Sequence, residues 1–264
     1  MNRFEPLTPN NDSQSQGPVL VYGRHPVREA LLSRKRVYER LYLLDSAQGE
    51  GIQEIKQEAK RLSLSLSIVS RKDLERLLGK DVLHQGVVLV CREKEVPRWK
   101  GVLERTRCLA GAVVVFVDQV EDTRNLGSII RNASVFGAEA VIVSRARTAP
   151  MEADGVKATS GEIEKIDVLQ INNFAAVLKA FRDTGFWIAA LDGQGDRVLW
   201  DLHLRTGPLG VVIGGEDRGV RRRVMNLSDW IVRIPLSRGS HSLNASVALG
   251  IALYEIRRQQ GIGE

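Results

Sequence analysis

Two short apolar runs near the end of the chain, each followed by a loop, constrain the fold more than any other feature. The first run, residues 209–213, is rich in valine and stops at Gly214 and Gly215. The second, residues 230–234, stops at Pro235. Apolar, β-branched runs of this length that end at Gly or Pro are typical of buried strands. We therefore predict that both are strands of an α/β sheet.

A helix is expected to close the chain after these strands. The segment SHSLN at residues 240–244 supplies short polar side chains of the kind that cap a helix N-terminus. Ligands of open α/β sheets bind outside the carboxyl ends of the strands. We therefore expect a site where the two strand ends meet the start of the last helix.

Strands alternate with helices throughout the second part of the chain. The pattern predicts strands at 113–117, 140–143 and 186–191, helices at 126–136 and 173–183, and a loop with a short helix between 143 and 173. Such alternation favours a parallel sheet with helices on both faces. The order of the strands does not follow from the pattern.

Residues 19–92 show a second, shorter alternation that predicts a small α/β domain. The expected elements are helices at 26–33, 51–62 and 72–78 and strands at 41–44, 64–69 and 87–90. The division of the chain is then a disordered tail at 1–18, this domain at 19–92, a polar linker at 93–110 and a larger domain at 111–264.

Three motifs in the larger domain resemble those of the SpoU-type RNA ribose 2′-O-methyltransferases, which are TrmH-like members of the SPOUT superfamily. They are DQVEDTRNLGSIIRNA at 118–133, IGGEDRG at 213–219, and IPL at 234–236 followed by SLNAS at 242–246. The likeness extends from about residue 19 to the end. It implies a C-terminal α/β domain with a parallel sheet and a trefoil knot, S-adenosyl-L-methionine as cofactor, and a homodimer formed through this domain.

The resemblance also implies which residues carry the chemistry. Methylation of a ribose hydroxyl needs close in-line placement of the hydroxyl and the methyl donor. A guanidinium remains protonated in proteins and is a poor base, so we interpret Arg131 chiefly as a phosphate clamp that also stabilises a developing alkoxide. The catalytic residues implied are Arg131, Asn125, Glu216, Ser242 and Asn244.

The cofactor is expected to lie mainly against backbone groups. The residues implied are Gly214, Ile234, Leu243, Gly215 and Leu236, and no metal ligand is expected. Purely structural roles remain open for the polar candidates: Glu216 could hold the shape of its loop, Ser242 and Asn244 could cap the last helix, and Arg131 could be an ordinary surface arginine.

Two segments of the smaller domain resemble markers of an RNA-binding, substrate-binding domain. They are Tyr22-Gly23-Arg24-His25 and His84-Gln85-Gly86. One branch of the family has this domain and methylates a guanosine of large-subunit (23S) rRNA, so rRNA is the expected substrate and tRNA the alternative. Both histidines could instead belong to hydrogen-bonded turns.

Several other features allow two interpretations. The basic clusters at 34–36 with Arg40, and at 221–223, could contact RNA phosphates or be solvated. Glu162 stands where the family usually has alanine and is expected to put a charge near the substrate-facing loop. The stripe formed by Leu243, Val247, Ile251 and Tyr254 on the last helix is first of all expected to be core packing.

Composition limits the remaining classes of function. A formal charge of +6 suits a polyanionic partner. Cys91 and Cys108 are the only cysteines, without metal-binding spacing, and no apolar run approaches a membrane span, so we expect a reducing, cytoplasmic location and no membrane partner. A noncatalytic RNA-binding protein with a degenerate knot is a competing hypothesis. A nucleotide-dependent oxidoreductase is disfavoured because no G-x-G-x-x-G opens the first βαβ unit.

Overall fold

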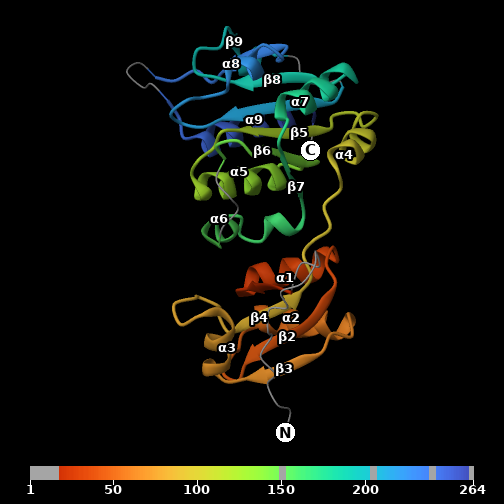
Figure 1. The fold of residues 1–264 in the computed structure, drawn as a ribbon, viewed down its shortest axis with the longest axis vertical. Coiled ribbons are helices and arrows are strands. Elements are labelled where there is room, and N and C mark those ends of the chain that lie inside the picture. The colour runs from red at the N-terminus through yellow and green to blue at the C-terminus, as the bar shows by residue number, and fades with distance from the viewer. Residues whose placement is uncertain (1–17, 149–152, 203–206, 238–241, 262–264) are drawn as a thin grey trace. The chain divides into compact units, whose positions relative to one another are not determined.

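The computed structural model describes residues 18–148, 153–202, 207–237 and 242–261 (Figure 1). The chain divides into two compact units between Glu95 and Val96. Each unit is a layered arrangement of helices on a sheet, as the sequence predicts, and each is described by itself below.

The N-terminal unit has a four-stranded mixed sheet in the order β1-β4-β2-β3. Strand β4 runs antiparallel to β1 and β2, and β2 runs parallel to β3. The elements are β1 (Val19–Tyr22), α1 (Arg24–Ser33), β2 (Tyr38–Leu44), α2 (Glu50–Arg61), β3 (Leu66–Val69), α3 (Arg71–Leu78) and β4 (Val87–Cys91). Helices α1 and α2 bury their apolar sides with Leu41, Leu43 and Leu89, whereas Leu74 of α3 packs with Tyr42 and Val88. The alternation along β2 and β4 therefore separates two cores, one on each face of the sheet.

The C-terminal unit has a seven-stranded sheet in the order β7-β6-β5-β10-β8-β11-β9, and all of its pairings are parallel. The strands are β5 (Val113–Asp118), β6 (Ala140–Ser144), β7 (Asp167–Ile171), β8 (Trp187–Leu191), β9 (Arg197–Val198), β10 (Leu209–Gly214) and β11 (Trp230–Arg233). The helices are α4 (Trp99–Thr106), α5 (Thr123–Val135), α6 (Ala153–Ala158), α7 (Phe174–Asp183), α8 (Arg222–Met225) and α9 (Ala245–Gln259), with short 3₁₀ turns at Glu162–Glu164 and Leu199–Asp201. The predicted parallel sheet is confirmed; the knot stays a prediction.

Helices cover both faces of this sheet, which is why its central strands are continuous apolar runs. Along β5, Val115 and Val117 point into a core that includes Leu126 and Ile129 of α5 and Leu249 of α9. The alternate residues, including Phe116, point into a second core with α4, α7 and α8. Successive side chains of a strand point to opposite faces, so each central strand packs against both helical layers.

Three features differ from the sequence-based expectations. The interval 93–110, expected to be a linker, contains α4, whose Val102 and Leu103 are buried in the second core. Strand β7 lies in the interval expected to be a loop, and β1, β9 and α8 are additional short elements. These segments are short or lie at a sheet edge, and all except β1, which reads VLVY, lack the continuous apolar runs of the central strands.

The predicted core stripe on the last helix is wrong. Val247, Ile251 and Tyr254 are 48%, 39% and 59% exposed, while Leu249 and Leu253 of the same helix are fully buried. A helix that is apolar over most of its circumference has two candidate core faces, and periodicity alone does not choose between them. Helix α9 therefore presents an apolar stripe at its surface.

The order of strands reverses at the middle of the sheet: β6 and β7 lie on one side of β5, and all later strands lie on the other. Strand β5 lies between β6, the next strand in sequence, and β10, which follows much later. The two strands end in register, with Gly214 opposite Asp118. The carboxyl ends of β5 and β10 therefore form the switch point at which ligands of open α/β sheets bind.

Candidate active site

Three predicted site residues from distant parts of the chain form one hydrogen-bonded cluster at this switch point. Asn125 Nδ2 donates to Glu216 Oε1 at 3.0 Å, and Asn244 Nδ2 donates to Asn125 Oδ1 at 2.8 Å. Asn244 Nδ2 also contacts Glu216 Oε1. Thus the first, second and third motifs each contribute one side chain to the cluster.

Each of the two asparagines lies at the N-terminal end of a helix. Asp122 caps α5 by accepting from the backbone N–H of Asn125 at 2.8 Å, which puts Asn125 in the first turn of that helix. Asn244 caps α9 and accepts from the backbone N–H groups of Ser246 and Val247 at 3.0 and 3.3 Å. The capping role considered for Asn244 is confirmed, and the same side chain takes part in the cluster.

The carboxylate of Glu216 lies at the positive end of α9. Its Oε1 accepts from the backbone N–H of Ala245, the first helical residue, at 3.4 Å in addition to the two side-chain amides. A carboxylate at a helix N-terminus is stabilised by the helix dipole and by otherwise unpaired N–H groups. Within the described residues, Oε2 of Glu216 has no hydrogen-bond partner, so it remains available to a ligand.

Glycines shape the loop that carries Glu216. The N–H of Gly219 donates to the carbonyl of Gly215 at 2.8 Å, which closes the loop on itself. A Cβ on Gly215 would lie 2.3 Å from the carbonyl oxygen of Gln119, and one on Gly214 would lie 2.1 Å from the carbonyl carbon of Gly219. Real Cβ atoms do not approach so closely, so both positions require glycine. The loops after β5 and β10 are consequently in direct backbone contact.

Two other predicted catalytic residues are not part of the cluster. Arg131 is exposed on α5 and, among the described residues, makes no hydrogen bond or ion pair. Ser242 is exposed and lies two residues before the cap of α9, which is formed by Asn244 rather than by Ser242. Ser240 and His241 lie outside the described residues.

The predicted cofactor-binding residues follow two strands that flank β8. Gly214 ends β10 and is buried, and Gly215 follows it half-buried. Ile234 comes directly after β11 and packs partly against the core, Leu236 is 38% exposed, and Leu243 is half-buried just before the cap of α9. Backbone groups at two strand ends are thus available to a flat ligand.

Sequence reasoning missed two further polar contacts around the site. Asn132 Nδ2 donates to the carbonyl of Ser246 at 2.7 Å and ties α5 to the first turn of α9. Asp118 and Arg221 form a buried ion pair beneath the Glu216 loop. The sequence signal that points to this charged partner is an aspartate directly after an apolar run, because a buried carboxylate needs a compensating charge.

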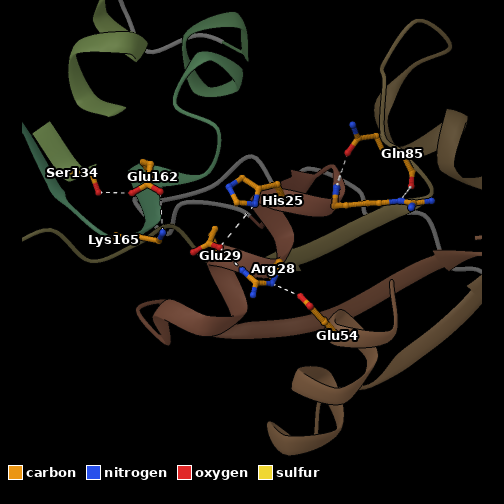
Figure 2. Close-up of polar contacts among 9 residues, drawn as sticks. His25, Arg28, Glu29, Glu54, Gln85, Ser134, Glu162 and Lys165 are labelled. Atoms are coloured by element: carbon orange, nitrogen blue, oxygen red, sulfur yellow. Dashed lines mark hydrogen bonds and ion pairs between the residues drawn. The ribbon is translucent and has the colours of Figure 1, made fainter. Parts of the chain in front are cut away.

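The two marker segments of the N-terminal unit meet each other (Figure 2). Gln85 Oε1 accepts from the backbone N–H of Arg24 at 2.9 Å, and the Arg24 Nε donates to the carbonyl of Gln85 at 3.3 Å. His84 Nδ1 accepts from the N–H of Gly86 at 3.0 Å, as the structural interpretation of this histidine expects. His25 is exposed, and its Nδ1 lies 3.9 Å from Glu29, which is itself paired with Arg28 at 2.8 Å.

Glu162, the charged departure from the family pattern, is held within the C-terminal unit. It accepts from Ser134 Oγ of α5 at 2.7 Å and pairs with Lys165 at 2.9 Å (Figure 2). Its carboxylate therefore joins the 3₁₀ turn to α5.

The described ranges contain neither a metal-binding cluster nor a membrane-spanning helix. Within them, no three His, Cys, Asp or Glu side chains gather in a way that would hold a metal ion. None of the helices there combines the length and apolar character needed to cross a bilayer.

Known proteins resemble this chain in fold and in sequence. AviRb from Streptomyces viridochromogenes, a SpoU methyltransferase solved in complex with AdoMet, has the same fold, with a TM-score of 0.76 and 24% identity over 94% of this chain and 92% of that one. A putative TrmH family tRNA/rRNA methyltransferase of Staphylococcus epidermidis is 31% identical over 92% of this chain and 96% of its own length. A 23S rRNA (guanosine-2′-O-)-methyltransferase, RlmB, of Pectobacterium atrosepticum is also 31% identical, over 92% and 98%.

Family matches cover both units. Residues 20–97 match the RNA 2′-O ribose methyltransferase substrate binding family. Residues 112–254, which include the whole cluster around Glu216, match the SpoU rRNA Methylase family. The chain therefore belongs to the SpoU rRNA Methylase family and has the substrate-binding domain of RNA 2′-O ribose methyltransferases at its N-terminal side.

Proposed function

We propose that this protein transfers a methyl group from S-adenosyl-L-methionine to the ribose 2′-hydroxyl of a guanosine in large-subunit rRNA. The observation that carries the proposal is the Asn125–Glu216–Asn244 cluster at the switch point of a SpoU-family chain. A noncatalytic protein with a degenerate site would not need all three side chains to be kept in one hydrogen-bonded arrangement.

The groups present fit this cofactor. Backbone groups of Gly214 and Gly215 after β10, and of residues 234–236 after β11, would hold the adenosyl part, while the Glu216 carboxylate complements a positively charged sulfonium. When bound, S-adenosylmethionine supplies an electrophilic methyl on that sulfonium.

The side chains divide into an orienting and a charge-stabilising set. Asn125 and Asn244 fix Glu216 Oε1, which leaves Oε2 to accept a hydrogen bond from the ribose or from an arginine. Arg131, exposed and unpaired within the described part of the chain, is free to bind a phosphate of the target nucleotide and to stabilise the developing alkoxide. Ser242 is assigned to positioning the ribose.

The N-terminal unit favours rRNA as substrate. It matches a substrate-binding family, and the Pectobacterium relative, which aligns over 92% of this chain, is named for 23S rRNA. The basic residues that follow α1, beginning with Arg34, offer phosphate contacts. The Staphylococcus relative is named for tRNA/rRNA, so tRNA remains the second candidate. The proposed rRNA substrate supports a cytoplasmic location.

We propose that the chain forms a homodimer in which a second copy packs against the exposed stripe on α9. Val247, Ile251 and Tyr254 recur at helical spacing, and Val135 of α5 is 61% exposed. Apolar side chains that gather at a surface mark association sites. Sedimentation equilibrium of wild type and Ile251→Glu tests this: a dimer that dissociates in the variant supports the proposal, and a monomeric wild type contradicts it.

Transfer of labelled methyl to unmodified 23S rRNA and to tRNA tests the main proposal. We expect label on a guanosine ribose of the rRNA alone, mapped by resistance of the adjacent bond to alkaline hydrolysis. Label on tRNA alone would overturn the substrate assignment. Absence of label on naked rRNA and on assembling ribosomal particles alike would overturn the catalytic assignment.

A further inference from the structure

A buried ion pair lies directly beneath the loop that carries Glu216. Asp118, the last residue of β5, has no exposed surface. Its carboxylate accepts from Arg221 Nε at 3.1 Å, and its second oxygen lies 2.5 Å from the terminal nitrogen Nη2 of the same guanidinium. The second contact is a close approach of opposite charges in which Asp118 Oδ1 makes no hydrogen bond within the described residues, so the Nε hydrogen bond is what orients the guanidinium.

Asp118 holds both ends of the Glu216 loop. Its backbone carbonyl accepts from the N–H of Gly215 at 3.2 Å, one residue before Glu216. Its carboxylate accepts from the backbone N–H of Arg221 at 3.0 Å, just past the other end of the loop. Glu216 therefore belongs to a closed backbone segment whose two ends share one anchoring residue.

Arg221 connects this anchor to the neighbouring elements. Its Nη2 donates to Ser144 Oγ, at the end of β6, at 3.0 Å. Its guanidinium lies 5.8 Å from the ring centroid of Phe174, the first residue of α7. The side chain is 34% exposed, whereas the adjacent Arg222 and Arg223 are exposed on α8. Of these three consecutive arginines, the first is thus the one built into the fold.

We propose that Arg221, through its ion pair with Asp118, is a positioning residue for methyl transfer that fixes the Glu216 loop against the ends of β5 and β6. The inference rests on the proposed function. Glu216, whose Oε1 accepts from Asn125 and Asn244, lies on the loop that Asp118 anchors at both ends. Loss of Arg221 leaves the buried carboxylate of Asp118 uncompensated, loss of the Asp118 charge leaves the guanidinium without its anionic acceptor, and a lysine has no Nε–H in the place of the arginine's.

The test compares Arg221→Lys, Arg221→Gln and Asp118→Asn with the control Arg223→Gln, which removes an exposed positive charge two residues away. Three quantities are measured for each: the dissociation constant for S-adenosylhomocysteine by calorimetry, the single-turnover methylation rate at saturating cofactor and RNA, and the thermal midpoint without ligand. We expect all three test variants to bind S-adenosylhomocysteine about tenfold more weakly, the size of one lost charged hydrogen bond. Their single-turnover rates should fall at least as much, while Arg223→Gln keeps the wild-type affinity.

The Lys variant retains the positive charge and guards against simple misfolding. A thermal midpoint that falls while affinity and single-turnover rate stay at wild-type values would show a merely structural ion pair and overturn the proposal. The double variant Asp118→Asn/Arg221→Gln should lose less affinity than the sum of its parts, because the two groups act as a pair; additive losses would count against it. A wild type that binds S-adenosylhomocysteine but methylates no RNA overturns the proposed function, while the affinity comparison still decides the role of Arg221.

Discussion

The side-chain amide of Asn244 donates to Asn125 Oδ1 at 2.8 Å across 119 residues of sequence. Asn244 is also the N-cap of α9, so one side chain both starts the last helix and closes the site. Stability and activity should therefore respond differently to substitutions that keep one role and remove the other.

Asn244→Ala and Asn244→Ser separate these two roles. Alanine removes the cap and should lower the free energy of unfolding by about 0.5–2 kcal/mol, whereas serine, also a good cap, should cost only a few tenths. Both variants lose the amide that donates to Asn125 and Glu216, so both should lose most of their methylation rate. Denaturant unfolding and single-turnover assays measure the two effects; a serine variant with wild-type activity would contradict the role of the amide in the site.

Arg131→Ala should impair catalysis without destabilising the fold. The side chain is exposed and makes no hydrogen bond within the described residues, so the unfolding midpoint should not move. Removal of a charge-stabilising donor should lower kcat by about a hundredfold to a thousandfold. Arg124→Ala, at another exposed arginine of the same helix, is the control. Equal rates for wild type and Arg131→Ala would remove Arg131 from the mechanism.

Arg257 is predicted to stabilise the C-terminal unit. It donates to the carbonyls of Phe136 and Gly111 at 2.6 and 3.0 Å, and also contacts that of Gly137, at the end of α5 and the start of β5. Burial lowers the pKa of Arg257 from its ordinary value, as expected for a desolvated cation. Arg257→Ala removes the donor to the carbonyls of Phe136 and Gly137, whereas Gly111 keeps the hydrogen bond from Gln260 Nε2, and should cost about 2–3 kcal/mol of unfolding free energy.

Arg258→Ala provides the matched comparison for Arg257. Arg258 is exposed and pairs with Glu255 at 2.8 Å, so its loss should cost less than about 1 kcal/mol. Chemical denaturation of both variants gives the two values, and similar losses would refute the role assigned to the half-buried Arg257.

The capping box of α3 should make a pH-dependent contribution to the stability of the N-terminal unit. The hydroxyl of Ser70 donates to Asp73 at 2.6 Å and holds the pKa of that carboxyl below its ordinary 3.8. Because the folded-state pKa is lowered, the contribution is present above pH 3.8 and is lost as the pH falls through the folded-state value. The difference in unfolding midpoint between wild type and Asp73→Asn should therefore shrink on acidification. A difference that stays constant below pH 3.8 would contradict this.

Two helical glycines should respond to alanine in opposite directions. A Cβ on Gly127 would lie 2.2 Å from the carbonyl oxygen of Gly155, where α5 packs on α6. Gly127→Ala should therefore cost about 1–3 kcal/mol through overpacking. A Cβ on Gly101 of α4 would lie 3.7 Å from Pro97, an ordinary contact, so Gly101→Ala should stabilise by about 0.5–1 kcal/mol. Thermal unfolding of both variants checks the signs.

Much of the sheet could be predicted from the sequence because its central strands are buried on both faces. Strands β5, β6, β8 and β10 are apolar runs bounded by polar residues or glycine, and these boundaries were predicted to within a residue or two. Strand β7 at the sheet edge reads DVLQI and is only partly buried, so its pattern is weaker. Helix α4 was missed because Lys100, Gly101 and Glu104 interrupt its apolar residues.

The candidate site was only partly predictable for a different reason. Motif resemblance named Asn125, Glu216 and Asn244, but their hydrogen bonds depend on strand order and register, which periodicity does not contain. The same holds for Asp118 and Arg221, which are 103 residues apart in sequence. The exposure of Val247, Ile251 and Tyr254 depends on which side of α9 faces α5, and this too is a property of the assembled layers.

The central strand β5 pairs with β10, which is synthesised much later, so the site between them cannot form early in synthesis. Strands β6, β7, β8 and β9 are synthesised between these partners, and the cap of α9 follows later still. Contacts between residues far apart in sequence form slowly, since the intervening chain must first be ordered. A nascent chain that lacks α9 has neither Asn244 nor the helix end that holds Glu216. The site can therefore form only after Asn244 and α9 have been synthesised, when the N-terminal unit has had time to fold.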